Sequence, residues 1–123
     1  GVLLLGEDQS DRVFPIAQKT IDCQPRIFSP NGDGCHDKTE IVFHLSQPSN
    51  VTVKIYNPAG RLVKTIVESK QMFSNDKGRQ IVSWDGRDYN GRLVPDNIYI
   101  VVVIIENDKG NEIRKKTVVV AKK

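Results

Sequence analysis

The sequence predicts an all-β fold in which seven antiparallel strands form a sandwich of two sheets. Apolar and polar residues alternate over most of the chain after residue 20, and this period of two is typical of strands with one buried face. Clusters of Gly, Pro, Asn and Asp separate the alternating runs at intervals of about 8–14 residues, as in sandwiches built from short strands. No segment shows the apolar period of an amphipathic helix.

Each predicted strand follows from one alternating run. Pro25 interrupts the first run, and because proline has no N–H to donate, this run suits the edge of a sheet. Ile98–Ile105 is apolar on both faces, which predicts a central strand covered on both sides; an exposed apolar sheet face is the alternative. The predicted strands are Ile21–Ile27, Ile41–Leu45, Val51–Tyr56, Arg61–Glu68, Arg79–Asp85, Ile98–Ile105 and Glu112–Ala121.

The segments between the strands carry turn signals. Asn57–Gly60 has Pro at the second and Gly at the fourth position of a type I turn, so residues 51–68 are expected to form a hairpin. Asn107–Gly110 predicts a second hairpin turn, whereas residues 69–78 are expected to form a polar loop. The number and spacing of the strands favour an immunoglobulin or fibronectin type III-like β-sandwich. An OB-like barrel is less favoured because it normally includes a helix and fewer strands.

The length and charge of the chain limit its function. A chain of 123 residues is long enough for one domain with its own core. Its net charge of +3 is too small to indicate a nucleic-acid partner, and no apolar run approaches the roughly 20 residues that would insert across a membrane. Residues 1–21 are expected to be a lead-in or linker with one edge strand near Arg12–Ile16, and residues 22–121 the sandwich domain. Because the chain opens on Gly1, we expect a fragment of a longer protein that is monomeric by itself.

The first turn cluster, Phe28–Asp37, carries oxygen ligands at alternate positions. Asn31, Asp33 and Asp37 surround two glycines, and tight loops of this kind bind calcium through alternate side chains. The match to an EF-hand loop is poor, because Val42 stands where the bidentate Glu is needed. The alternative is purely structural, since Asn and Asp side chains also cap backbone amides in turns. Calcium is therefore the one cofactor that the sequence leaves open.

Cys23 and Cys35 are the only two cysteines of the chain. Their spacing fits neither a zinc site nor a redox pair. In an oxidising compartment a disulfide between them would tie the first strand to the first turn cluster and stabilise the fold by about 3 kcal/mol. Two unpaired thiols, one buried and one on a loop, are the alternative.

The second turn cluster, Trp84–Gly91, follows the fifth predicted strand. Trp84 alternates in phase with Val82, which predicts that its ring fills the core between the sheets. Asp85 is placed to accept hydrogen bonds from amides two or three residues later. A contribution of Asp85 and Asp88 to a cation site is the weaker alternative.

The residues for catalysis are few, and we predict no enzyme. The histidines are His36, in the first turn cluster, and His44, on the polar side of its strand. A nucleophile needs a positioned base and an orienting partner, which sequence neighbours on a tight turn do not supply. Carbohydrate binding is a separate possibility, for which the stacking candidates are Tyr56, Trp84, Tyr89 and Tyr99.

Five stretches of the sequence, taken together and in the order in which they occur, resemble the immunoglobulin-like domain of the flagellar hook-capping protein family. The resemblance covers roughly residues 22–120, and sorting domains of the gliding-motility type share a similar Ser-Pro-Asn-Gly-Asp-Gly loop. Cys35 departs from the family, which usually has a small apolar residue there. The matching stretches are Phe28–Gly34 with Asp37, Val51–Tyr56, Ala59–Val63, Trp84–Asp88 with Gly91, and Val94–Tyr99.

This resemblance implies a non-catalytic module at the C-terminus of a bacterial exported protein, located at the cell surface, outside the cell or in the periplasm. Such a module would act as a spacer, an anchor or a protein-docking domain. Its partners would be neighbouring domains of a longer parent protein, and envelope or export components. A carbohydrate-binding accessory module of a secreted hydrolase and a calcium-stabilised adhesion domain are the alternatives.

Overall fold

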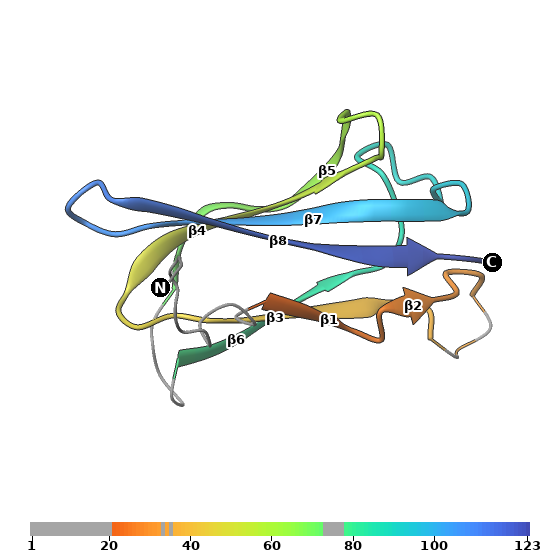
Figure 1. Cartoon of the computed structure of the whole chain (residues 1–123). Helices are drawn as coiled ribbons and strands as arrows, with labels where there is room; N and C mark the ends of the chain where they lie inside the picture. The colour runs from red at the N-terminus through yellow and green to blue at the C-terminus, as the bar shows by residue number, and fades with distance from the viewer. Residues whose placement is uncertain (1–20, 33, 35, 73–77) are drawn as a thin grey trace, which may run out of the picture.

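The computed structural model describes residues 21–32, 34, 36–72 and 78–123, and these residues form two stacked β-sheets (Figure 1). The prediction of an all-β sandwich is confirmed. The predicted lead-in and the edge strand near Arg12–Ile16 lie outside the described residues. The strands are β1 (Ile21–Gln24), β2 (Ile27–Phe28), β3 (Thr39–His44), β4 (Ser49–Tyr56), β5 (Leu62–Met72), β6 (Arg79–Trp84), β7 (Asn97–Glu106) and β8 (Glu112–Ala121).

The strands divide into a three-stranded sheet of order β1-β3-β6 and a five-stranded sheet of order β2-β8-β7-β4-β5. Figure 1 shows the two sheets as separate layers. All strand pairs are antiparallel except β2 and β8, which pair in parallel through Ile27 with Val120 and Phe28 with Ala121. Within the described chain there are thus eight strands, one more than predicted, and one parallel pair.

The extra strand arises because the chain crosses between the sheets at Pro25. The prediction of one strand over Ile21–Ile27 is wrong in this respect. The Pro25 carbonyl accepts a hydrogen bond from the Thr39 hydroxyl of β3 at 2.7 Å, so it faces the three-stranded sheet. The next carbonyl, that of Arg26, accepts from the Val120 amide of β8 at 2.8 Å and faces the five-stranded sheet. Proline has no backbone N–H, so the ladder of hydrogen bonds between β1 and β3 ends here without leaving a donor unpaired.

The second difference lies in β5, which continues to Met72 although residues 69–72 were predicted to belong to a loop. β5 is an edge strand that pairs only with β4, through Val51 with Lys70 and Ser49 with Met72. Glu68 to Gln71 are exposed, so this part of the strand has no buried side chain to produce an apolar alternation. The predicted turns at 57–60 and 107–110 are confirmed by amide-to-carbonyl bonds of 2.9 and 3.1 Å across them.

The core contains a chain of three aromatic rings that joins the sheets. Trp84 of β6 packs between Phe28 of β2 and Tyr99 of β7, with ring centroids 5.5 Å apart in both pairs. The Trp84 indole N–H donates to the Arg87 carbonyl at 3.0 Å, and the Tyr99 hydroxyl donates to the Pro95 carbonyl at 2.6 Å. Buried aromatic rings need such partners for their polar atoms. The prediction that Trp84 fills the core is confirmed.

β7 is central in its sheet, and its outer face is covered only in part. Val101 and Val103 are fully buried against the opposite sheet. Ile98, which faces outward, is 50% exposed, and Ile100 and Ile104 are half-buried. Val102, on the same outer face, is buried at 6% exposure, so the prediction of a strand covered on both sides holds at Val102, whereas the alternative, an exposed apolar sheet face, describes Ile98.

Candidate functional site

The first turn cluster is closed by the side chain of Asp37. Its Oδ1 accepts from the Gly32 amide at 2.9 Å and its Oδ2 from the Gly34 amide at 2.7 Å. The Ser29 amide donates to the His36 carbonyl at 2.7 Å, which holds the base of the loop. A carboxylate that accepts two backbone amides fixes a turn in the way that Asx capping does.

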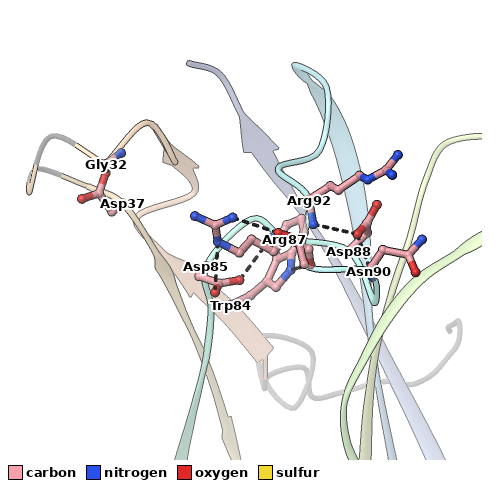
Figure 2. A network of polar contacts seen from close by, with 9 residues as sticks. Gly32, Asp37, Trp84, Asp85, Arg87, Asp88, Asn90 and Arg92 are labelled. Atoms are coloured by element: carbon pink, nitrogen blue, oxygen red, sulfur yellow. Dashed lines mark hydrogen bonds and ion pairs between the residues drawn. The ribbon is translucent and has the colours of Figure 1, made fainter.

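The second turn cluster is organised by two aspartates (Figure 2). Asp85 Oδ1 accepts from the Arg87 amide at 3.1 Å, which confirms the predicted role of this residue. Asp88 Oδ1 accepts from the amides of Asn90 at 2.9 Å and Arg92 at 3.0 Å. The Arg87 guanidinium donates to the Gly91 carbonyl at 2.9 Å, across the same turn. The carboxylates of this cluster are therefore also used to hold the backbone.

The two clusters meet at Gly86. Its φ is +79°, and a Cβ added there would lie 2.7 Å from Cβ of Pro30 and 3.3 Å from the ring of Phe28. The Gly86 carbonyl accepts from the Val94 amide at 2.9 Å. Glycine is thus required both for its positive φ and for the close approach of the two loops.

Of the predicted calcium ligands, the structure describes Asn31 and Asp37, whereas Asp33 lies outside the described residues. Both oxygens of Asp37 accept backbone amides, and Figure 2 shows Asp37 with Gly32 apart from the aspartates of the second cluster. Among the described residues, no group of three or more His, Cys, Asp or Glu side chains is placed to hold a metal ion. The calcium site stays a prediction.

Cys23 is a buried free thiol on the inner face of β1. Burial, followed by the neighbouring Asp22 carboxylate, raises the pKa of this thiol to about 11. Cys35 lies outside the described residues, so the disulfide between Cys23 and Cys35 also stays a prediction.

The two histidines lie apart. His36 is exposed in the first turn cluster, and His44 is exposed at the last residue of β3. Because β3 extends from one to the other, the two imidazoles do not act on the same substrate atom.

A cleft that sequence reasoning missed lies between the β4–β5 turn and the second turn cluster. It has a volume of about 450 Å³ and is lined by Pro58, Leu62, Tyr89 and Pro95, among others. Tyr89 is 73% exposed, whereas Tyr99 of the same cleft is buried. A smaller cleft of about 280 Å³ lies at the β7–β8 turn, beside His44 and Lys115. These residues come from segments far apart in sequence, and no local pattern marks them.

Comparison with known proteins gives the family. Residues 22–120 match the model of the type IX secretion signal domain named CHU_C. The chain belongs to this family. No curated protein matches the sequence. Among the described residues, no helix is of a length and hydropathy to cross a membrane.

Three solved structures from other bacteria share the fold. FlgD from P. aeruginosa is 25% identical with a TM-score of 0.56, over 68% of this chain and 60% of that one. FlgD from Xanthomonas campestris, whose structure is described as giving insight into the hook capping essential for flagellar assembly, is 21% identical with a TM-score of 0.52, over 68% of this chain and 57% of that one. Dimeric latent PorU from Porphyromonas gingivalis is 16% identical with a TM-score of 0.59, over 83% of this chain and 9% of PorU. This chain thus spans about 60% of the first of these proteins.

Membership in the secretion signal family decides the predictions about catalysis and about export. The domain is non-catalytic, and it directs the export of its protein by type IX secretion to the cell surface or the medium. The resemblance to the hook-capping domain is a likeness to those structures, while the family is that of the secretion signal.

The contact between the two turn clusters yields a prediction about stability. Gly86→Ala should lower the free energy of unfolding by about 2–4 kcal/mol, because a strained φ is added to an overlap with Pro30. Gly91→Ala is the matched control, since Gly91 has a φ of +80° but open space around it, and it should cost only about 1–2 kcal/mol. Urea unfolding measures both; equal losses would contradict the close approach at Gly86.

Burial of Cys23 yields a prediction about pH. Its folded pKa of about 11 lies above the ordinary 9.0, so the stability contributed by the neutral thiol is present below pH 9 and is lost as the pH rises toward 11. Between roughly pH 8 and pH 10.5, the reduced protein should lose about 2 kcal/mol more unfolding free energy than Cys23→Ala does. Urea unfolding at both pH values measures this difference.

The same measurement tests the disulfide. If Cys23 pairs with Cys35, the excess loss should appear only after reduction, because a disulfide sulfur does not titrate. An equal excess with and without reductant would contradict the disulfide, and no excess in either state would contradict the buried thiol.

Proposed function

We propose that this domain is a folded docking signal, which binds a component of the secretion apparatus through its surface and afterwards anchors or spaces the protein that carries it. The family match supports recognition by type IX secretion. The observation that carries the docking role is the exposed apolar outer face of the five-stranded sheet, where Ile27, Ile98 and Val118 are 61%, 50% and 42% exposed. Exposed apolar surface of this kind is typical of protein contacts.

The polar groups of the two turn clusters also support a docking role. The carboxylates of Asp37, Asp85 and Asp88 all accept backbone amides of their own loops. They fix the described backbone around them, so a partner meets a defined shape there. The neighbouring domains of a longer parent protein, and the envelope or export components, are the partners that we propose.

A secretion assay tests the proposal. The 123-residue chain is fused behind a reporter that enters the periplasm, in a bacterium that has type IX secretion, and the reporter is measured inside and outside the cells. We expect reporter at the surface or in the medium only when the chain is attached. Phe43→Asp, which breaks the buried core, is the unfolded control. Equal retention of the reporter with and without the chain would contradict the signal role.

Carbohydrate binding is the second candidate, and the exposed ring of Tyr89 in the 450 Å³ cleft favours it. Sugars stack on exposed aromatic faces in such clefts. If this function exists, the protein should bind glycans on an array, and Tyr89→Ala should bind about tenfold more weakly. An array without hits would exclude it. A calcium-stabilised adhesion domain rests on Asn31, Asp33 and Asp37 alone.

A further inference from the structure

Six outward-facing apolar side chains form a grid on the five-stranded sheet. Strand register places Ile27, Val120 and Ile98 in one cross-strand row, on β2, β8 and β7. The next row, on β8, β7 and β4, contains Val118, Ile100 and Tyr56. Partners in register lie on the same face of a sheet, so the two rows are contiguous. We call these six residues the apolar grid.

The opposite outer face of the sandwich differs. On the three-stranded sheet the outward rows contain Asp22 with Val42 and Ile81, and then Gln24 with Glu40 and Ser83. Two apolar residues among these six are ordinary for a solvated face. The apolar grid is therefore a property of one face, and the general composition of the strands does not account for it.

Lysines border the grid. Lys116 and Lys54 flank Val102 in the next row, and Lys122 follows Val120 by the strand period on the other side. None of these three lysines forms an ion pair with another described residue, whereas Arg114 pairs with Glu112 at 2.6 Å. Toward the β7–β8 turn, the first carboxylates beyond the grid are those of Glu106 and Glu112, three outward rows away from Ile100 and Val118. At the other end, Asp96 precedes Ile98 by the strand period, and its Oδ1 accepts from the Lys123 amide at 3.0 Å.

We propose that the apolar grid docks onto a protein surface of the secretion apparatus that has an apolar centre and an acidic border. The inference rests on the proposed function and assigns it to one face. Charge complementarity selects the partner, because unpaired lysines around an apolar centre attract carboxylates and discourage wrong partners. A second copy of this chain, packed by a two-fold axis, would instead bring two lysine borders together.

Paired substitutions test the grid in the reporter fusion. Ile98→Thr with Val118→Thr removes apolar surface but keeps β-branched residues, which retain strand propensity. Ile81→Thr is the matched control, because Ile81 is 45% exposed on the outer face of the other sheet (Figure 1 shows β6 in the other layer). We expect about a tenfold fall in exported reporter for the double variant, and an unchanged amount for the control, with melting temperatures of the purified chains showing that all are folded.

Charge reversal tests the border. Lys54→Glu with Lys116→Glu should lower export by a similar factor, whereas Arg79→Glu, on the outer face of the three-stranded sheet, should leave it unchanged. Export of the grid and border variants at the wild-type level, while the wild-type chain exports normally, would overturn the inference and leave the proposed function standing. If the wild-type chain fails to export the reporter, the proposed function fails as well.

Two further measurements separate other occupants. The purified chain is mixed with vesicles of phosphatidylglycerol and phosphatidylethanolamine, and its sedimentation is followed at rising concentration. Vesicle binding that the Ile98→Thr and Val118→Thr pair abolishes would replace the protein partner by a lipid surface. Self-association abolished by the same pair would replace it by a second copy. We expect neither, so that loss of export is the only effect of the variants.

Discussion

The indole of Trp84 holds both sheets and both turn clusters in one arrangement. Its ring packs against Phe28 and Tyr99 of the opposite sheet, and its N–H donates to the Arg87 carbonyl inside the second turn cluster. Phe28 is also the residue from which the first turn cluster departs, and the Tyr99 hydroxyl holds the Pro95 carbonyl near the second. The described ends of both turn clusters are therefore anchored to the packing of one buried side chain, and parts anchored in this way lose little entropy when a partner binds them.

The aspartates at the turns hold the loop backbone. Asp37, Asp85 and Asp88 each accept amides of their own loop, which satisfies donors that would otherwise be unpaired. The carboxylate oxygens thus accept hydrogen bonds from the loop backbone. The outer face of the five-stranded sheet differs from an ordinary solvated face by the exposed apolar side chains of the grid.

The sequence predicts the strands well because a sandwich imposes a period of two wherever one face is buried. Trp84, Asp85 and the two hairpin turns follow from local chemistry, and the structure confirms them. The crossing at Pro25 could not be foreseen, because it depends on acceptors bound by β3 and β8, which are distant in sequence. The sequence leaves the exposure of Ile98 open between two alternatives, since an apolar run does not say whether anything lies above it. The cleft beside Tyr89 is assembled from separate loops and leaves no local signal.

The parallel pairing of β2 with β8 has a mechanical consequence for a protein tethered at a cell surface. The Arg26 and Phe28 carbonyls accept from the amides of Val120 and Lys122 at 2.8 and 2.9 Å. Tension applied between the chain before β2 and the chain after β8 would pull these parallel strands past each other, so both bonds would bear the force together instead of opening one after the other. The ring of Phe28, on β2, packs against Trp84 in the core behind this strand pair. After the two hydrogen bonds break, the packing of the hydrophobic core would bear the force.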